Sequence, residues 1–473
     1  MCSKGLKSEK LPFCRKTGIR NFTSYIPSFK KTPIRIIVFG FALLILTASF
    51  LLMLPVSSRT GQPTGFTDAL FTAASSVCVT GLVVYDTNTY WSSFGHWLIL
   101  FLIQTGGLGI MTMVTFFFIF LRRNIGIHEK LALQESLNKY SFSGLTDTLL
   151  KILKLTFIFE AAGAAVFSIR FIPIYGLGEG IKKSIFHSVS SFCNAGFDLT
   201  GSASAPFSSL SAFNRDPLVL LTAAFLIITG GLGFMVWMDI SALRKKRLPD
   251  LGTKVILTST AVLLVFGTVF IFLSEYNNPA TLGELSWQSK LLNSFFHSVT
   301  ARTAGFNTLA ISEMKDSTNL VNILMMYIGA APGSTAGGIK VTTFAVIIFS
   351  LFSFIKGHSR VGLFFRKVPQ TVIFKSFSIF ALSIFMVIIS VLVLLINREG
   401  SLMQVLFESV SAFGTVGLST EITPSLETAS KLQLVLTMFI GRIGPFTAAA
   451  LFNTNGSSHQ KKYELPEGRI NVG

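Results

Sequence analysis

Four short segments that end in glycine recur along this 473-residue chain at nearly equal spacing. They are residues 76–81, 191–196, 301–305 and 412–417, and their final glycines are 115, 109 and 112 residues apart. Backbone carbonyls can replace the water lost by a dehydrated cation if successive residues turn them toward one axis. Such a run needs alternating, partly left-handed dihedral angles, which glycine tolerates. The recurring segments therefore predict cation coordination by main-chain oxygens.

The candidate cation-binding residues are the last members of each segment. They are Val77, Cys78, Val79, Thr80 and Gly81; Cys193, Asn194, Ala195 and Gly196; Arg302, Thr303, Ala304 and Gly305; and Gly414, Thr415, Val416 and Gly417. One such glycine is weak evidence, but four in register predict a selectivity filter with K⁺ at its carbonyls. The third segment is one residue shorter between Phe296 and its glycine, so we expect imperfect fourfold symmetry. We expect Arg302 to brace the filter from behind, because a cation in the pathway would repel ions.

Short helices are predicted just before these segments, at 66–75, 182–190, 291–300 and 403–411. We expect them not to cross a bilayer, so that their C-terminal dipole ends face a pore centre and favour a cation there. Polar residues follow the glycines: Asp86, Asp198, Asn307 and Glu421. They form either a cation-concentrating ring at the outer mouth or ordinary solvated loops. Glu408, in the fourth short helix, is a candidate for helix packing or filter bracing.

The elements that must position these segments are membrane helices. Half of the residues are hydrophobic and only 13% are charged, against about 25% in soluble domains. Apolar runs of spanning length occupy 34–54, 97–121, 149–172, 217–238, 255–273, 320–354, 372–396 and 432–452. We therefore predict an all-α polytopic membrane protein. Its plan is four repeats of membrane helix, pore helix, filter loop and membrane helix around one central pore.

The positive charge is distributed as in a multi-pass membrane protein. Formal net charge is +18, and Lys and Arg cluster in the first 33 residues, after alternate apolar runs and at the C-terminus. The intervening loops, such as 56–65 and 419–430, are nearly free of them. This pattern predicts a cell-membrane location with both termini cytoplasmic, and it argues for contact with membrane lipid and against nucleic acid. No cleavable signal peptide is evident, because the first apolar run has spanning length.

These boundaries divide the chain into four pore repeats and two tails. The expected units are a basic cytoplasmic tail (1–33), pore repeats 34–121, 146–242, 252–356 and 369–454, and a cytoplasmic tail (455–473).

The sixth apolar run is interrupted by glycine and proline. The interruption is a candidate gating loop, 329–338, with Gly329, Pro332, Gly333, Ser334, Thr335, Ala336, Gly337 and Gly338. Irregular backbone at membrane depth survives only inside protein or facing water, so this segment is either a gate beneath the third filter segment or a structural kink. Arg442 lies at the corresponding place in repeat four, and an intramembrane arginine is usually functional. We expect it either to reach the carbonyls of the loop or to form an electrostatic barrier near the ion path. The matching stretches 106–109 and 230–233 lack charge and predict close helix packing.

Other classes of protein fit less well. A membrane enzyme needs clustered metal-binding or acid–base residues, and none is visible in the membrane region. Cys2, Cys14, Cys78 and Cys193 show neither metal-site spacing nor a disulfide framework. A non-conducting membrane scaffold or sensor is a further alternative, but it would have no use for four filter glycines.

The sequences at 79–87, 302–308, 333–340 and 441–445 resemble the superfamily of K⁺ transporters that includes Trk, Ktr and plant HKT proteins. The match covers about 34–455. Eight spans without two extra N-terminal helices are more similar to the Ktr membrane subunit than to the Trk one. The resemblance implies filter glycines Gly81, Gly196, Gly305 and Gly417, a gating loop at 329–338 and a loop-contacting Arg442. Cys78 and the basic N-terminal tail have no counterpart in the family's motifs.

The resemblance also implies an activity and partners. It implies K⁺ uptake by a homodimer with one pore in each subunit, gated with a cytoplasmic RCK-type, KtrA-like ring of nucleotide-binding regulatory subunits. Na⁺-selective relatives have serine at the first filter position, so Gly81 favours K⁺; dependence on Na⁺ is left open. We expect no organic cofactor in this chain.

Overall fold

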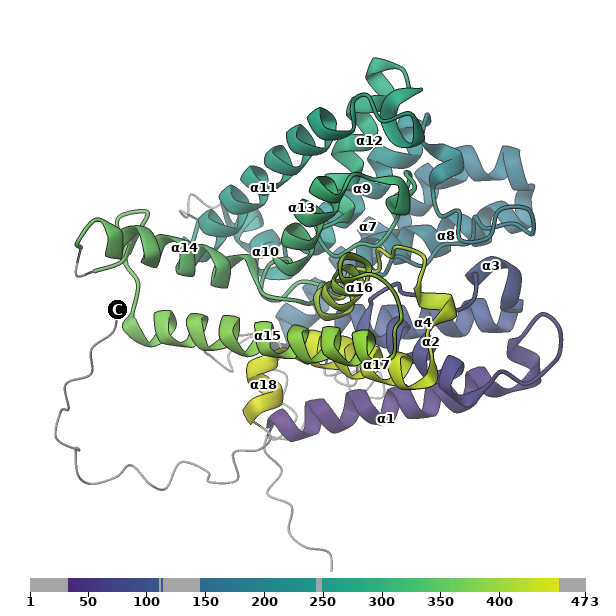
Figure 1. Cartoon of the computed structure of the whole chain (residues 1–473), viewed down its shortest axis with the longest axis horizontal. Helices are drawn as coiled ribbons and strands as arrows, with labels where there is room; N and C mark the ends of the chain where they lie inside the picture. The colour runs from purple at the N-terminus through teal and green to yellow at the C-terminus, as the bar shows by residue number, and fades with distance from the viewer. Residues whose placement is uncertain (1–32, 110–111, 114–144, 244–248, 359, 451–473) are drawn as a thin grey trace, which may run out of the picture.

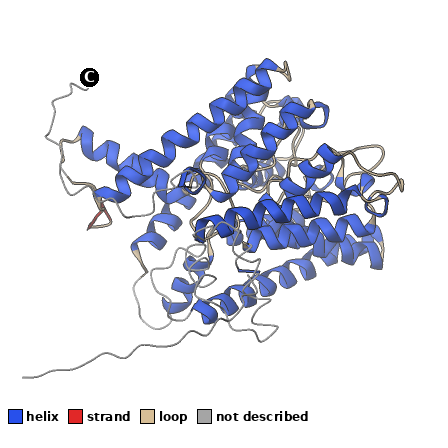
Figure 2. Ribbon diagram, turned by 90° about the horizontal axis from the view of Figure 1, so that it is seen from below, coloured by secondary structure: helices blue, strands red, loops and turns tan. Residues whose placement is uncertain are grey.

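The computed structural model describes residues 33–109, 112–113, 145–243, 249–358 and 360–450. Residues 1–32 of the predicted N-terminal tail, with Cys2 and Cys14, lie outside the described residues, and so does the predicted C-terminal tail. The part that is described is almost entirely helical (Figure 2).

Each repeat begins with one long apolar helix. These helices are α1 (Pro33–Met53), α7 (Leu145–Tyr175), α11 (Leu251–Glu275) and α15 (Gln370–Ile396). Within the described residues, these are the four helices that are long and apolar enough to cross a membrane individually. Phe39, Phe157, Phe266 and Phe385 are exposed on them. Such surfaces suit hydrocarbon, where a helix satisfies its backbone groups internally.

A short helix follows each long one, as predicted. These pore helices are α2 (Phe66–Cys78), α8 (Leu177–Cys193), α12 (Trp287–Thr300) and α16 (Leu402–Gly414). One phenylalanine is buried at the same level in each: Phe71, Phe186, Phe296 and Phe407. Three of the helices continue past the predicted ends, so Val77, Cys78, Cys193 and Gly414 lie in a last helical turn and not in an extended loop.

The second membrane helix of each repeat ends before the predicted apolar run does, whereas the sequence predicted an interruption only in repeat three. These helices are α4 (Ser93–Leu108), α9 (Pro217–Gly231), α13 (Asp316–Tyr327) and α17 (Thr428–Ile443). After a break, three of them resume as α10 (Phe234–Leu243), α14 (Val341–Ile355) and α18 (Pro445–Ala450). The break between α9 and α10 bends the path by 90°. Most of the expected run after Leu108 lies outside the described residues.

The breaks have a common cause in three repeats. Gly109, Gly233 and Gly444 follow the helices with φ values of 85°, 85° and 95°. An α-helix cannot continue through such an angle, and glycine adopts it without a Cβ penalty. Proline follows Gly444 directly and begins α18. In repeat three the predicted interruption, residues 329–338, separates α13 from α14.

Contacts between repeats close the four units into a ring (Figure 1). Helix α4 packs on α8, α9 on α12 and α13 on α16, and α17 returns to pack on α2. The second membrane helix of each repeat thus supports the pore helix of the next repeat. The pore helices form the buried centre of the main core.

The remaining elements are short. They are α3 (Thr87–Tyr90), η1 (Pro55–Ser57), η2 (Ser211–Phe213), η3 (Pro279–Gly283), η4 (Ile311–Glu313), η5 (Thr423–Ser425) and a hairpin of β1 (Gly362–Leu363) and β2 (Arg366–Lys367). The hairpin joins α14 to α15.

Candidate functional site

The four glycine-terminated segments share one backbone conformation. The residue two positions before each final glycine has a positive φ: Val79 (59°), Asn194 (59°), Thr303 (72°) and Thr415 (49°). The glycines are also positive: Gly81 (92°), Gly196 (70°), Gly305 (80°) and Gly417 (92°). Positive φ is uncommon for residues with a Cβ and unfavourable for β-branched ones. Its recurrence in all four repeats indicates that the surrounding structure enforces this conformation, as is common at functional sites.

The final glycines form a closed ring. A Cβ on Gly81 would lie 2.5 Å from the carbonyl oxygen of Ala195, and a Cβ on Gly196 would lie 2.8 Å from that of Ala304. In the same way Gly305 faces the carbonyl of Val416, and Gly417 faces the carbonyl of Thr80. The order runs from repeat one through two, three and four back to one. Glycine is required at each position by close approach as well as by φ.

The residue before each glycine is tied to its pore helix. Thr80 N, Ala195 N and Val416 N donate to the carbonyls of Ser75, Ser190 and Ser411 at 2.8, 2.8 and 2.9 Å. In repeat three, Ala304 N donates to Thr300 O at 3.0 Å, so this loop closes over one residue fewer. The missing residue is therefore absorbed in the turn after α12, and Gly305 still occupies its place in the ring.

Serine side chains support the ring, a feature that the sequence reasoning missed. The N–H groups of Gly81 and Gly417 donate to Ser75 Oγ and Ser411 Oγ, both at 3.1 Å. Ser190, the equivalent residue of repeat two, donates instead to Phe197 O at 2.6 Å. The signal was present in the sequence, because serine stands six residues before the glycine in three repeats.

The double-glycine stretches pack beneath the pore helices. A Cβ on Gly106, Gly230 or Gly441 would collide with the carbonyl oxygens of Val77, Phe192 and Phe413 respectively. Close packing at 106–109 and 230–233 is thus confirmed. The same stretches also break the helix, which the packing interpretation did not include.

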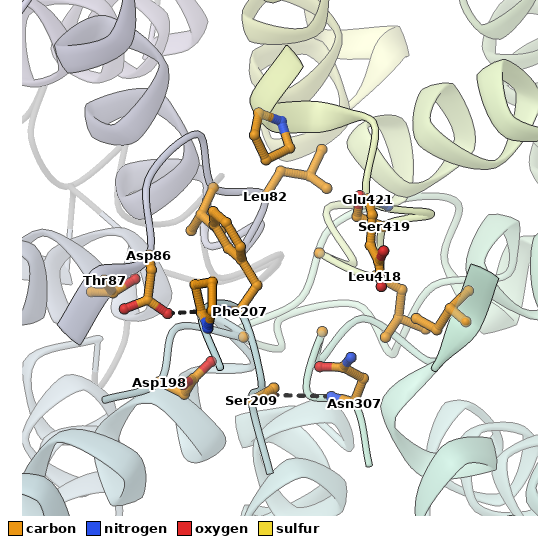
Figure 3. A pocket seen from close by; sticks show the side chains of 18 residues that line it. Leu82, Asp86, Thr87, Asp198, Phe207, Ser209, Asn307, Leu418, Ser419 and Glu421 are labelled. Carbon is orange, nitrogen blue, oxygen red and sulfur yellow. Dashed lines mark hydrogen bonds between the residues drawn. The ribbon is translucent and has the colours of Figure 1, made fainter. Parts of the chain in front are cut away.

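A cavity of about 430 Å³ lies on one side of the ring (Figure 3). All four final glycines line it, together with Asp86, Asp198, Asn307 and Glu421. We call this cavity the vestibule. Each repeat contributes one of these four polar residues, so the structure brings together residues that the sequence placed after each glycine. Carboxylates in a concave site raise the local concentration of cations.

Asp86 also shapes the vestibule wall. Its Oδ2 accepts a hydrogen bond from Phe207 N at 2.9 Å, and its Oδ1 accepts one from Thr89 N at 2.8 Å (Figure 3). Phe207, which has a φ of 56°, lines the vestibule. The carboxylate of repeat one therefore holds the loop of repeat two over the mouth.

Asp198 lies deeper than an ordinary surface acid. Burial raises the pKa of its carboxyl above the usual value of 3.8, the hydrogen bonds from Thr200 oppose the shift, and nearby Asp86 adds to it. Thr200 donates to Asp198 Oδ1 from its N at 3.1 Å and its Oγ1 at 2.7 Å. The charge of the vestibule is consequently sensitive to acid.

Glu408 braces the fourth filter segment. One carboxylate oxygen accepts hydrogen bonds from Ser419 Oγ and from Thr420 N at 3.0 Å, and the other accepts one from Thr423 Oγ1 at 3.0 Å. These donors lie two, three and six residues after Gly417 in the chain. Of the two roles predicted for Glu408, bracing is the one that these contacts support.

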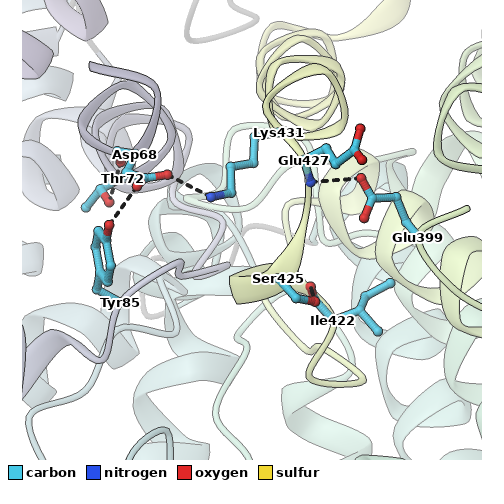
Figure 4. A network of polar contacts seen from close by, with 8 residues as sticks. All are labelled: Asp68, Thr72, Tyr85, Glu399, Ile422, Ser425, Glu427 and Lys431. Atoms are coloured by element: carbon cyan, nitrogen blue, oxygen red, sulfur yellow. Dashed lines mark hydrogen bonds and ion pairs between the residues drawn. The ribbon is translucent and has the colours of Figure 1, made fainter. Parts of the chain in front are cut away.

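Repeats four and one are joined by an ion pair (Figure 4). Lys431 Nζ of α17 lies 2.8 Å from Asp68 Oδ1 of α2. The hydroxyl of Tyr85, which follows the first filter segment, donates to the other oxygen of Asp68 at 2.7 Å. This contact reinforces the seam where the two ends of the four-repeat chain meet.

The predicted gating loop lies against the filter segments on the side away from the vestibule. Thr335 Oγ1 contacts Phe192 O and Asn194 Oδ1, both at 3.3 Å, and Gly337 N donates to Thr415 Oγ1 at 3.1 Å. A Cβ on Gly338 would lie 3.2 Å from Gly414 Cα. The loop therefore contacts the innermost residues of the second and fourth segments.

The rest of the loop is held by contacts within it, by the broken helix of repeat two and by the side chain of Lys340. Ser334 Oγ donates to Ala331 O at 2.7 Å, and a Cβ on Gly329 would collide with Gly337 O. Carbonyls of Pro332 and Gly333 face Gly233, and Phe234 N donates to Gly333 O at 3.1 Å. Lys340 Nζ donates to Ala336 O at 2.7 Å.

Arg442 makes the predicted contact with the loop. Its Nη1 donates to Thr335 O. Its Nη2 donates to Gly106 O and, at 3.3 Å, to Gly107 O in the break of repeat one. The contact with repeat one was not predicted.

The remaining predicted site residues lie away from the ring surface. Arg302 is buried and lines a small cavity with Ile228, Thr260 and Leu264, behind the filter segments. Cys78 and Cys193 are buried free thiols. The described residues contain no group of three or more His, Cys, Asp or Glu side chains that suits a metal ion.

The sequence of this chain is similar to known transport proteins. A family model described as cation transport protein, TrkH, matches residues 23–461. The Ktr system potassium uptake protein B of Bacillus subtilis is 40% identical over 442 residues, 93% of this chain and 97% of that protein. The potassium/sodium uptake protein NtpJ of Enterococcus hirae is 37% identical over 446 residues, 93% of this chain and 97% of the relative.

The fold is also shared with a solved structure. The crystal structure of the potassium transporter TrkH from Vibrio parahaemolyticus superposes with a TM-score of 0.71 at 17% identity, covering 92% of this chain and 87% of that one. At this identity the likeness shows the fold alone, a helical membrane protein of four repeats around a pore. Family, relatives and fold agree with the resemblance seen in the sequence and exclude the enzyme alternative. The chain is a multi-pass membrane protein that belongs to the TrkH family of cation transport proteins.

Proposed function

We propose that this chain is a K⁺ uptake protein of the Ktr type in the cell membrane. The observation that carries the proposal is the ring in which Gly81, Gly196, Gly305 and Gly417 each face the carbonyl of the next repeat, beneath an acidic vestibule. A dehydrated cation on the axis of such a ring meets oxygens from all four repeats. We propose that residues 77–81, 193–196, 302–305 and 414–417 form the filter, with the carbonyls as the K⁺ ligands.

The choice of ion rests on two supports. The relatives are described as proteins for potassium uptake and, in one case, for potassium/sodium uptake. Gly81 stands where Na⁺-selective members of the superfamily have serine, which favours K⁺. We keep Na⁺ as the second candidate, either as a coupled or as a transported ion.

We further propose that residues 329–338 are the gate and that Arg442 holds it shut. The loop lies beneath two filter segments, and the guanidinium joins Thr335 O to the broken helix of repeat one. A loop with several glycines has a large conformational entropy to lose, so its closed position depends on these contacts. Binding of a partner with different affinities for the two positions then shifts the equilibrium.

The proposed partners follow from the Ktr relatives. We propose a homodimer with one pore in each subunit, bound on its cytoplasmic face by an RCK-type ring that binds a nucleotide. The proposed orientation has both termini cytoplasmic and the vestibule outside, as the distribution of Lys and Arg indicates. A reporter placed after Gly473 should be cytoplasmic and one within 200–216 external; the reverse result would overturn the orientation.

The test of the function is K⁺ uptake by a bacterium that lacks its own K⁺ transport systems. Cells that carry this chain with a Ktr regulatory subunit should grow at limiting K⁺, and cells with the regulatory subunit alone should not. A correctly inserted chain that supports no K⁺ or Na⁺ flux would favour the remaining alternative, a non-conducting scaffold or sensor.

A further inference from the structure

The hairpin between α14 and α15 lies at the edge of the molecule (Figure 2, red strands). Helix α14 lies at the opposite end from α3 (Figure 1), whose Thr87 lines the vestibule. Gly362 pairs with Lys367 and Leu363 with Arg366, and Val368 N donates to Val361 O at 2.9 Å. The two residues that turn the chain are Phe364 and Phe365. In the proposed orientation this hairpin lies at the cytoplasmic surface of the membrane.

The turn is strained by its own residues. Phe364 and Phe365 have φ values of 45° and 63°. Two-residue hairpins with positive φ at both positions strongly favour Asn-Gly, because a bulky side chain is disfavoured there. Phe365 is nevertheless fully exposed, so its ring gains no packing in return. Strain that internal packing does not explain points to a role for the two rings outside the chain.

The base of the hairpin is anchored to the helices. Leu363 and Val368 are buried in a small core with Val255 of α11 and with Ala345 and Val346 of α14. The aromatic tip is consequently held at a fixed position relative to these helices.

A cavity of about 340 Å³ lies beside the hairpin. Its polar lining is Arg360, Lys367 and Gln370, and Ile373 and Phe374 of α15 form an apolar wall. Helix α15 is one of the four membrane-spanning candidates and begins at Gln370. The cavity therefore lies where the span meets the headgroups, with cations on one side and hydrocarbon-like side chains on the other.

The two charged residues that line this cavity, Arg360 and Lys367, are both basic. From residue 317 to residue 398 the sequence contains no Asp or Glu. Within the described residues, neither the guanidinium of Arg360 nor the ammonium of Lys367 forms a hydrogen bond or ion pair. Two cations that no described residue pairs, beside an apolar wall, suit an anionic group that carries its own apolar part.

We infer that the hairpin and its cavity bind an anionic phospholipid of the cytoplasmic leaflet. Arg360 and Lys367 hold the headgroup phosphate, Phe374 and Ile373 contact the acyl chains, and Phe364 and Phe365 enter the interface beside it. An acidic protein surface would satisfy the cations, but it gives no reason for a strained aromatic tip or for the exposure of Phe354 and Phe374. The inference rests on the proposed function for its membrane orientation.

The site has a connection to the gate. Helix α14 begins at Val341, directly after the 329–338 loop, and ends shortly before the hairpin. A lipid held at the hairpin therefore fixes the far end of the helix that the loop must move.

The test is titration of the delipidated full chain in detergent with phosphatidylglycerol, followed by native mass spectrometry. The variant Arg360→Gln/Lys367→Gln should bind phosphatidylglycerol about 30-fold more weakly than the wild type, since each basic residue near anionic lipid contributes about a fivefold factor. The variant Lys356→Gln/Arg366→Gln removes the same charge outside the cavity and should keep a saturable site. Equal weakening in both pairs, or none in the first, would overturn the inference.

A second variant tests the tip without threatening the fold. Phe364→Asn/Phe365→Gly supplies the residues that the turn prefers, so its thermal stability should not fall, but phosphatidylglycerol binding should weaken severalfold. Unchanged binding would exclude a role for the aromatic tip. Displacement of the lipid by millimolar inorganic phosphate would make this a phosphate site and overturn the assignment to lipid.

Two further measurements separate the inference from the proposed function and from a protein occupant. If the cavity variant keeps phosphatidylglycerol binding but loses binding of a Ktr regulatory subunit, the occupant is a protein and the inference is wrong. K⁺ flux is measured in parallel in proteoliposomes. Wild-type protein that binds phosphatidylglycerol at this site but conducts no ion would refute the proposed function and leave the lipid site standing.

Discussion

Arg442 of α17 donates a hydrogen bond to the carbonyl oxygen of Thr335, 107 residues earlier in the chain. The second nitrogen of the same guanidinium reaches Gly106 O and Gly107 O of repeat one. One side chain thus joins three repeats beneath the filter. A planar group with five donors is suited to this task, whereas the single point charge of lysine is not.

Replacing Arg442 by Ala should raise K⁺ flux in the absence of a regulatory subunit. The change removes the contact that holds Thr335 O, so the open position of the loop becomes more populated. It should also lower the free energy of unfolding by about 1–3 kcal/mol, because buried carbonyls lose their partner. Rb⁺ uptake into proteoliposomes and thermal unfolding in detergent measure the two effects.

Arg442→Lys is the matched control for charge. It should show an intermediate flux, since an ammonium reaches one set of carbonyls at a time. If both variants conduct less than the wild type while remaining folded, the arginine supports the pathway and does not close it.

Shortening the loop between Gly333 and Gly337 should have the same direction of effect. The deletion removes the Thr335 contact with the second filter segment and the Gly337 contact with Thr415. Flux without a regulatory subunit should rise at least as much as with Arg442→Ala. A folded, membrane-inserted deletion variant with reduced flux would identify the loop as a scaffold of the pore.

Gly81→Ser should weaken discrimination of K⁺ over Na⁺. The new Cβ would lie 2.5 Å from Ala195 O and would occupy a φ of 92°, so the ring must distort. Competition between Rb⁺ and Na⁺ in uptake assays measures the effect. Gly65→Ala is the control, because a Cβ there meets nothing within 4 Å; unchanged selectivity in Gly81→Ser would argue against the filter assignment.

Acid should reduce uptake at limiting K⁺ through Asp198. Burial raises the pKa of this carboxyl above 3.8, so as the pH falls the folded protein takes up the proton earlier than an ordinary aspartate would. Because burial favours the neutral carboxyl, the vestibule loses this negative charge at pH values above 3.8. Asp198→Asn should show lower uptake at neutral pH and a flatter acid limb. An acid limb identical to that of the wild type would exclude Asp198 as its source.

The ion pair of Asp68 and Lys431 should stabilise the closed ring. Both side chains are largely buried and Tyr85 shares the carboxylate, so Lys431→Met should lower the free energy of unfolding by about 1–3 kcal/mol. The pair of Lys182 and Glu179 provides a control because its glutamate side chain is 56% exposed, so Glu179→Gln should change stability by less than about 1 kcal/mol. Thermal unfolding of the two variants in the same detergent decides the matter.

The sequence predicted the plan of the fold because its signals are local. The glycine at the end of each segment, the buried phenylalanine of each pore helix and the apolar length of α1, α7, α11 and α15 are each visible within a few turns of chain. Arg442 and the 329–338 loop were singled out for the same reason, since a charge and a broken helix are both anomalous at membrane depth. The resemblance to K⁺ transporters implied that the two are in contact.

What the sequence did not reveal depends on backbone geometry and on distant partners. The hydropathy pattern predicts one apolar run at 217–238, but the positive φ of Gly233 divides this run into two helices at 90°. Three pore helices end, and their filter segments turn away, where Val79, Asn194 and Thr415 adopt a left-handed conformation. No local rule assigns that conformation to these residue types. Contacts such as Arg442 with Gly106 O join residues more than 300 positions apart.

The ring of glycines has a rotational sense. Gly81 faces the carbonyl of Ala195 in the following repeat, and Gly417 faces that of Thr80. Each repeat, which forms one quarter of the ring, therefore contacts the next repeat around the ring. Because all four quarters belong to one polypeptide, a mutation alters a single quarter, whereas in a homotetrameric pore it would alter four at once. Selectivity can therefore evolve in steps of one quarter. Substitutions in adjacent quarters share a contact and should be non-additive, while those in opposite quarters should combine nearly independently.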